Sequence, residues 1–199
     1  MSVYYVNING YLSKSDSLHH IIKSLDPDII ILCEIRSVTA NTIRTQFKAL
    51  GYEPFIGKAS GMIVAAKFKF DMVNVTSTMS SRIISTSIKV GNTHMTLTGV
   101  YGPQESEKEE IRSQFYEELE TEIVAGLNRG NHILVIGDFN SKIAMKNGKY
   151  EELSPNGTLL NGVIDRSALH VLNFLDVCSG KWTRVHTSTV HNQSACEGQ

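Results

Sequence analysis

The sequence is poor in cysteine and in tryptophan, and it has no marked excess of charge of either sign. Its 199 residues include three cysteines, Cys33, Cys178 and Cys196, an odd number at wide spacing. This usage argues against a disulfide framework and against zinc-type motifs, and it predicts an intracellular protein of the nucleus or cytoplasm. The formal net charge of -1 excludes a strongly basic protein. Binding to nucleic acid would therefore need a local basic patch, or a metal ion that offsets phosphate charge.

Long hydrophobic runs and targeting signals are also missing. No apolar stretch approaches the length of a membrane span, so we expect no membrane partner. The segment that follows Met1 has neither a basic region nor an apolar region of the signal-peptide kind. A chain of this length predicts one domain, residues 1–199, with ample length for a core.

Short apolar runs and helical periodicities alternate along the chain. Ile29–Glu34 and His132–Ile136 are runs rich in β-branched residues and predict strands buried on both faces. A turn at Gly91-Asn92 predicts a hairpin of antiparallel strands. We expect further strands at 3–10, 61–67, 72–77, 83–90, 93–101, 173–177 and around Trp182-Thr183, helices at 15–25, 41–50, 106–128 and 156–171, and a polar loop at 141–155. This order predicts an α/β layered fold.

The long helix predicted at 106–128 carries apolar residues on one side and acidic residues on the other. Its core stripe is expected to be the set that recurs every fourth residue: Ile111, Phe115, Leu119, Ile123 and Leu127. A solvated surface is the simplest interpretation of the acidic side. Because acidic residues repel phosphate, a nucleic-acid surface is expected elsewhere.

Polar residues collect where the predicted strands end. Four such ends carry Asn7, Glu34, Tyr101 and the pair Asp138 and Asn140, and in a layered sheet fold they can meet at one rim. Separated carboxylates with amides between them suit a hard cation such as Mg²⁺, which stabilises charge on a phosphoryl oxygen. The alternatives stay open: Asp138 and Asn140 also suit an Asx turn, and the others also suit ordinary turns and surfaces.

Four of these segments resemble motifs of the endonuclease/exonuclease/phosphatase (DNase-I-like) superfamily, in the same order and at similar spacing. The overall sequence is most similar to the endonuclease domain of non-LTR (LINE-type) retrotransposons. The four segments are Asn7-Ile8-Asn9-Gly10, Glu34, Val100-Tyr101-Gly102-Pro103 and Gly137-Asp138-Phe139-Asn140. The resemblance implies a four-layered α/β sandwich, with two packed mixed β-sheets flanked by helices, that lacks its last strands. It also implies DNA as substrate and a reverse transcriptase downstream in the same polyprotein.

The resemblance implies roles for individual residues. Glu34, helped by Asn7, would ligate Mg²⁺ or Mn²⁺. Tyr101 and Asn140 would hold the scissile phosphate, and Asp138 would orient or deprotonate the attacking water. Residue Thr183 matches a late threonine of the family.

The sequence departs from the family pattern near its end. The family continues with Ser-x-Ile-Asp and then Asp-His, and these segments do not occur in the 199 residues. Asp165 and His170 occupy the wrong place in the order to replace them. Loss of a positioned acid or base costs about 10²–10⁴-fold in rate, so we expect this chain alone to be a weak or inactive nuclease. An inactive remnant that serves at most as a binding module, and a phosphatase acting on inositol phosphates or lipids, remain the alternatives.

Overall fold

The computed structural model describes residues 1–36, 38–57, 61–78, 82–146, 149–175, 186–187 and 194–195. They fall into two compact units, residues 1–140 and residues 141–199. The family-like segments all lie in the first unit. No helix among the described residues is both long and apolar enough to cross a bilayer.

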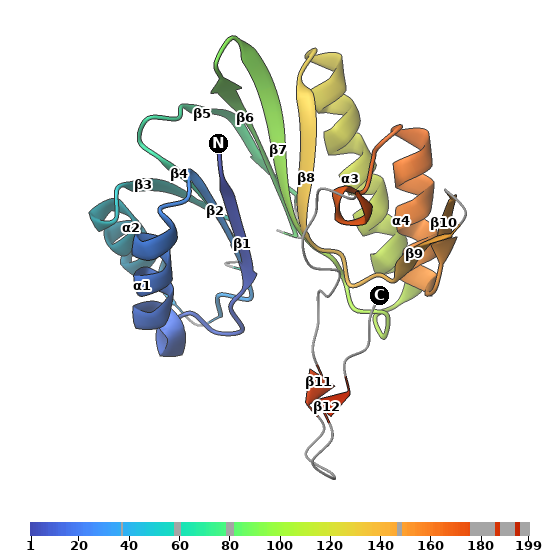
Figure 1. Ribbon diagram of the computed structural model, residues 1–199, viewed down its shortest axis with the longest axis horizontal. Helices are drawn as coiled ribbons and strands as arrows, with labels where there is room; N and C mark the ends of the chain where they lie inside the picture. Colours follow the sequence, from blue (N-terminus) through green and yellow to red (C-terminus); the bar gives the residue numbers. More distant parts are fainter. Residues whose placement is uncertain are drawn as a thin grey trace. The chain divides into compact units, whose positions relative to one another are not determined.

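The first unit contains two four-stranded mixed sheets (Figure 1). The first sheet has the order β1-β2-β4-β3 and the second the order β5-β6-β7-β8. β1 is parallel to β2, β7 is parallel to β8, and the other pairs are antiparallel. The strands are β1 Val3–Asn7, β2 Ile29–Cys33, β3 Tyr52–Ile56, β4 Met62–Lys67, β5 Met72–Ser77, β6 Ile83–Val90, β7 Thr93–Tyr101 and β8 His132–Asp138.

Helices cover the outer faces of both sheets. α1 (Ser15–Leu25) and α2 (Ala40–Ala49) pack on the first sheet, and α3 (Glu109–Asn128) packs on the second. A short 3₁₀ helix, Leu12–Lys14, precedes α1. The layers are therefore helix, sheet, sheet and helix, which confirms the predicted α/β sandwich.

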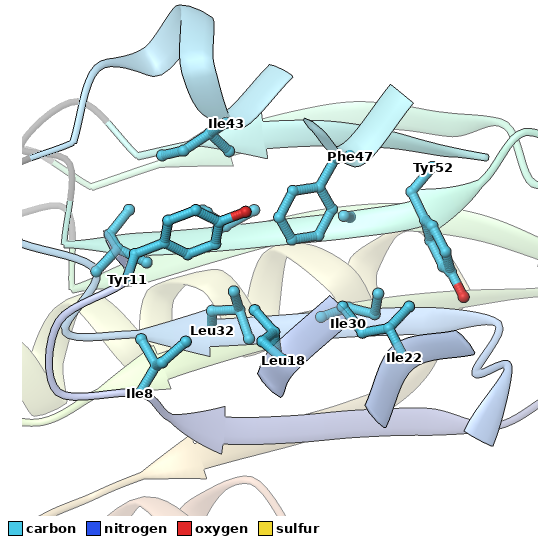
Figure 2. Close-up of a cluster of buried hydrophobic side chains, with 12 residues drawn as sticks. Ile8, Tyr11, Leu18, Ile22, Ile30, Leu32, Ile43, Phe47 and Tyr52 are labelled. Atoms are coloured by element: carbon cyan, nitrogen blue, oxygen red, sulfur yellow. The ribbon is translucent and has the colours of Figure 1, made fainter. Parts of the chain in front are cut away.

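Successive side chains of β2 point to opposite faces of the first sheet and pack into two different cores. Ile30 and Leu32 point toward α1 and α2, where they pack with Phe47 and other large residues (Figure 2). Ile29 and Ile31 point the other way and pack against the second sheet. β2 is buried along its whole length, as its unbroken apolar run predicts.

The second unit is smaller. Its helix α4 (Pro155–Arg166) begins after Ser154, whose hydroxyl accepts a hydrogen bond from the Gly157 amide at 3.1 Å. The other elements are β9 Ile143–Lys146, β10 Lys149–Glu152, the 3₁₀ helix Leu172–Phe174, β11 His186–Thr187 and β12 Ser194–Ala195. β9 pairs with β10, and β11 with β12, both antiparallel.

Three predictions of secondary structure were wrong, each for a local reason. The 141–155 segment is not a loop throughout, because β9 and β10 form a hairpin whose lysines and glutamates hide any apolar alternation. The expected strand at 173–177 begins instead as a 3₁₀ helix. The helix expected at 156–171 ends at Arg166, and Ala168 has a left-handed backbone (φ 50°) that cannot continue it.

β3 was missed because Pro54 lies at its centre. A proline cannot donate a ladder hydrogen bond, and it is tolerated because β3 is the last strand in the sheet order.

Two predictions of burial were also wrong. β8 is only half-buried from Ile133 onward, because it is the last strand in the order of the second sheet. On α3, Ile111 and Leu127 are exposed while Tyr116 and Gly126 are buried. A step of four residues turns a helix by about 400°, so a stripe drawn every fourth residue moves off the core face by about 40° per step.

Asp28 joins the start of β1 to the start of β2. Its Oδ2 accepts a hydrogen bond from the Ser2 amide at 2.8 Å, and its Oδ1 lies 2.7 Å from the Lys69 ammonium. The hydrogen bond from Lys69, followed by that from Ser2, lowers the pKa of Asp28 from its ordinary 3.8 to about 2.

We predict that this carboxylate stabilises the fold above about pH 4, and that the stabilisation is lost as the pH falls toward 2. Asp28→Asn should lower the free energy of unfolding by about 1 kcal/mol at pH 7. The loss is small because Lys69 is exposed, so solvent screens its attraction to Asp28. Urea unfolding from pH 7 down to pH 3 measures the difference in the free energy of unfolding between the variant and the unmodified protein, with the exposed Asp71→Asn as control. An equal loss at every pH would contradict the prediction.

Candidate active site

Two pairs of parallel strands place the predicted site residues at one rim of the first unit. β1 and β2 run in the same direction, so Asn7 lies beside Cys33 and Glu34 follows directly. β7 and β8 also run in parallel, so Tyr101 lies beside Asp138. The two sheets pack face to face, and hydrogen bonds described next connect these ends.

The Glu34 carboxylate is the centre of the hydrogen-bond network. Its Oε1 accepts hydrogen bonds from Asn7 Nδ2 at 2.8 Å and from the Tyr101 hydroxyl at 2.9 Å. Its Oε2 lies 2.6 Å from a guanidinium nitrogen of Arg36. Since Asn7 belongs to the first sheet and Tyr101 to the second, this one side chain connects the two sheets.

Glu34 remains ionised although it is partly buried, with 16% of its side chain exposed. Burial alone would raise the pKa of this carboxyl group, but the hydrogen bonds from Asn7, Tyr101 and Arg36 outweigh burial and lower it. In Tyr101 the pKa is raised, first by burial and then by the hydrogen bond that its hydroxyl donates to Glu34. Glu34 is therefore a charged acceptor at neutral pH, and Tyr101 is a neutral donor.

The segment Asp138-Phe139-Asn140 forms a turn fixed by side chains and backbone. The Asn140 amide donates to Asp138 Oδ1 at 3.0 Å, and Asn140 Nδ2 donates to the Gly102 carbonyl at 2.8 Å. The Gly102 amide in turn donates to the Asp138 carbonyl at 2.7 Å. The Asx turn that was an alternative to catalysis is thus present, and it holds the two polar side chains in place.

Left-handed backbone occurs where these strands end. Asn9, Glu34 and Asn140 have φ values of 46°, 55° and 46°. Asparagine tolerates this region, whereas a glutamate there costs roughly 1–3 kcal/mol. The chain holds Glu34 in this conformation through backbone bonds on either side, from Ile8 to Cys33 and from Gly10 to Glu34 itself.

A sequence model described as the Endonuclease/Exonuclease/phosphatase family matches residues 5–184. The chain belongs to this family. Members of the family are metal-dependent phosphodiesterases and nucleases. No curated protein matches the chain significantly.

Solved structures of similar fold have low sequence identity to this family member. The 3'-5' exonuclease NExo of Neisseria meningitidis has a TM-score of 0.66 at 16% identity, covering 83% of this chain and 71% of its own. The endonuclease domain of TRAS1, a telomere-specific non-LTR retrotransposon, has a TM-score of 0.57 at 16% identity, covering 88% and 74%. An AP endonuclease from Archaeoglobus fulgidus has a TM-score of 0.59 at 19% identity, covering 71% and 58%.

The chain spans 58% of the length of that archaeal enzyme and 48% of the length of TDP2 from C. elegans. Together these likenesses confirm the DNase-I-like fold.

The donor set at the rim suits the metal ions used by the family. Among the described residues no cluster of three or more His, Cys, Asp or Glu side chains could hold a metal. However, Glu34 is an ionised carboxylate, and its Oε2 already forms an ion pair with the exposed guanidinium group of Arg36. Asn7 faces Glu34 with its amide nitrogen, and its amide oxygen accepts a hydrogen bond from the Asn9 amide at 3.2 Å, so this amide must turn before its oxygen can reach an ion beside Glu34. Mg²⁺ in proteins commonly uses one or two carboxylates together with retained water. The residues therefore fit a hard cation.

Other residues considered from the sequence lie in the second unit or outside the described residues. Thr183 is not among the described residues. Asp165 is exposed in α4, and His170 is exposed after it.

The sequence did not indicate two residues that hold the rim together, Arg36 and Tyr116, and it assigned no role to Gly102 within the 100–103 motif. The Tyr116 hydroxyl, buried on α3, donates to the Phe139 carbonyl at 3.1 Å. Its only sequence signal is an aromatic residue one position from the expected apolar stripe. Arg36 lies two residues after Glu34, a spacing that could have suggested an ion pair.

Gly102 allows the backbone of the 138–140 turn to approach closely. A Cβ atom at this position would lie 2.4 Å from the Phe139 carbonyl oxygen, which is far inside van der Waals contact. We predict that Gly102→Ala lowers the free energy of unfolding by about 1–3 kcal/mol, because the turn must move. Chemical unfolding measures this loss. The matched control is Gly61→Ala, since a Cβ at Gly61 meets nothing within 4 Å. Equal stability of the two variants would contradict the prediction.

Proposed function

We propose that this family member is a Mg²⁺-dependent phosphodiesterase that nicks DNA, as the endonuclease domain of a non-LTR retrotransposon polyprotein that also carries a reverse transcriptase. The observation that carries the proposal is the Glu34 network at one rim with the Asp138–Asn140 turn. The likeness of fold to the TRAS1 endonuclease domain, which covers 88% of the chain, supports the retrotransposon assignment.

Asp138 serves as the group that orients and deprotonates the attacking water. The backbone N–H of Asn140 donates a hydrogen bond to Asp138 Oδ1, which fixes the direction of the Asp138 carboxylate. A fixed carboxylate beside the phosphate is suited to accept a proton from water. The charge of Asp138 acts on the hydroxyl of Tyr101, which is consistent with its carboxylate lying close to the phosphate-binding side chains.

Tyr101 and Asn140 bind the scissile phosphate. In the structure the single hydroxyl proton of Tyr101 is donated to Glu34, so contact with phosphate requires this hydroxyl to turn. Asn140 carries two amide protons, one of which is donated to Gly102. Neither side chain adds negative charge to a site that must accept a polyanion.

Two cations near the strand ends favour a polyanionic substrate. Arg36 is exposed beside Glu34. Lys14 ends the 3₁₀ helix Leu12–Lys14, and its ammonium donates to the carbonyl of Ile8, the residue after β1, at 2.6 Å. They supply the local positive charge that a protein with a net charge of -1 needs to hold DNA.

Glu34 and Asn7 would hold the metal ion, Mg²⁺ or Mn²⁺. When bound, the ion would stabilise negative charge on a phosphoryl oxygen. The protein residues still have to orient the water and bind the phosphate, and the 199 residues lack the Ser-x-Ile-Asp and Asp-His segments of the family. We therefore propose weak cleavage by these residues alone.

Supercoiled-plasmid nicking with Mg²⁺ tests the proposal, using the 199-residue chain and the same domain within its full reading frame. We expect the full reading frame to nick DNA about 10²–10⁴-fold faster than the chain alone. Asp138→Asn should abolish nicking in both forms, because it removes the proton acceptor without changing shape. The exposed Asp71→Asn is the matched control and should nick normally.

Two results would overturn the proposal. Nicking by Asp138→Asn at the normal rate would remove Asp138 from the mechanism. Folded proteins that fail to nick in either form would favour the inactive remnant, or a phosphatase if inositol phosphates or lipids are hydrolysed instead.

A further inference from the structure

Arg82 contacts Tyr101 through both its backbone and its side chain. It directly precedes β6, and its carbonyl accepts a hydrogen bond from the Tyr101 backbone amide at 2.8 Å, which continues the pairing of β6 with β7. Its guanidinium group lies over the Tyr101 ring, with Cζ 5.8 Å from the ring centroid. An arginine cation in this position is attracted to the face of an aromatic ring. Arg82 therefore touches the residue to which the proposed function assigns the scissile phosphate.

Glu107 holds the Arg82 side chain in this place. One terminal nitrogen of the guanidinium group donates to both carboxylate oxygens of Glu107, at 3.1 and 3.0 Å. Glu107 is itself fixed, because its Oε1 accepts a hydrogen bond from the Gln104 amide at 2.9 Å and its own amide donates to the Gln104 carbonyl at 3.0 Å. The side chains of Arg82 and Glu107 are only 25% and 28% exposed, so solvent screens this pair less than a fully exposed one. The charge of Arg82 is thus balanced within the protein.

Tyr101 needs a restraint besides its hydrogen bond to Glu34. Its hydroxyl donates to Glu34 Oε1 at 2.9 Å, and this bond fixes the ring for as long as it lasts. Because a hydroxyl has a single proton, the bond to Glu34 is broken when that proton turns to a phosphate oxygen. The ring must then be held by a contact that does not use the hydroxyl. Arg82, on the face of the ring, makes such a contact.

We propose that Arg82 is a positioning residue for Tyr101: held by Glu107, its guanidinium group keeps the Tyr101 ring in place while the hydroxyl passes from Glu34 to the scissile phosphate. This inference rests on the proposed function, which gives Tyr101 the task of binding that phosphate. Arg82 then contributes to the rate through Tyr101 and is not itself a ligand of DNA. A direct contact of Arg82 with DNA would act on affinity instead, because loss of a phosphate contact weakens binding and reduces its dependence on salt.

Kinetics of nicking by the full reading frame test the inference, with Arg82→Gln and Glu107→Gln as variants. Arg82→Gln should lower kcat about tenfold and leave KM for DNA unchanged, since a displaced Tyr101 hydroxyl costs rate. Glu107→Gln should lower kcat several-fold although it makes the protein less negative, because the weakened pair no longer holds the guanidinium group on the ring. The matched control is Glu105→Gln, which makes the same change of charge on an exposed side chain two residues away and should leave both constants unchanged.

A double-mutant cycle with Tyr101→Phe shows whether Arg82 acts through the tyrosine. Tyr101→Phe removes the hydroxyl that Arg82 positions, so the addition of Arg82→Gln should lower kcat no further. Losses that multiply in the double variant would overturn the inference. Weaker binding by Arg82→Gln with kcat unchanged, or tighter binding by Glu107→Gln with kcat unchanged, would likewise overturn it and assign Arg82 to DNA.

NMR of the tyrosine rings supplies a readout that does not depend on activity. In protein with isotope-labelled tyrosine, the Tyr101 signals are those that disappear in Tyr101→Phe. Arg82→Gln and Glu107→Gln should shift these signals more than those of the other tyrosines, and Glu105→Gln should leave them in place. If the unmodified protein does not nick DNA, the proposed function fails while the Tyr101 signals still decide whether Arg82 holds the ring. Unchanged Tyr101 signals in both variants overturn the inference.

Discussion

The arrangement of the site depends on one partly buried negative charge. Glu34 is partly shielded from water directly after β2, and an unpaired carboxylate in that place would be costly. Donors from β1, from β7 and from the segment that follows β2 stabilise it. Because these donors come from both sheets, the requirement to satisfy Glu34 also fixes how the sheets align at the rim.

Close backbone contact at the end of β8 imposes a second constraint. A Cβ on Gly137 would lie 2.0 Å from the Val100 carbonyl oxygen, and one on Gly102 would meet Phe139. Both glycines therefore allow β7, β8 and the following turn to approach more closely than other residues permit. This approach brings Asp138 beside Tyr101 in the parallel register. The Asp138 carboxylate and the Tyr101 hydroxyl, which contacts Glu34, are neighbours because both of these positions are glycine.

Much of the fold could be predicted because its strongest signals are local. The runs of β2 and β8, the hairpin turn at Gly91-Asn92 and the periodicity of α1 each identify an element without tertiary information. The position of a strand in its sheet is not local. Pro54 obscured β3, and the apolar run of β8 predicted a fully buried strand although β8 lies at the end of its sheet order.

The site shows the same division between local and tertiary information. The sequence could predict that one rim would bring together Asn7, Glu34, Tyr101, Asp138 and Asn140, because each lies in a short contiguous motif. Tyr116 could not, since it acts on the Phe139 carbonyl from a helix 23 positions away and its residue type fits an ordinary core. Arg36 carries no signal of its own beyond proximity to Glu34. Residues that position others have no motif, because any side chain that reaches the right atom serves.

A conflict of charge connects this geometry to the chemistry. In the proposed reaction the rim would present two carboxylates, Glu34 and Asp138, to a substrate whose reacting group is itself negative, so unassisted binding would be opposed. The structure lessens the conflict without removing either carboxylate: Arg36 covers the outward oxygen of Glu34, and Tyr101 and Asn7 cover the inward one. Since Arg36 is exposed, it is the partner that a hard cation can displace at the smallest cost in buried contacts. Under the function proposed above, Glu34 would therefore support the fold without a metal ion and receive one during the reaction.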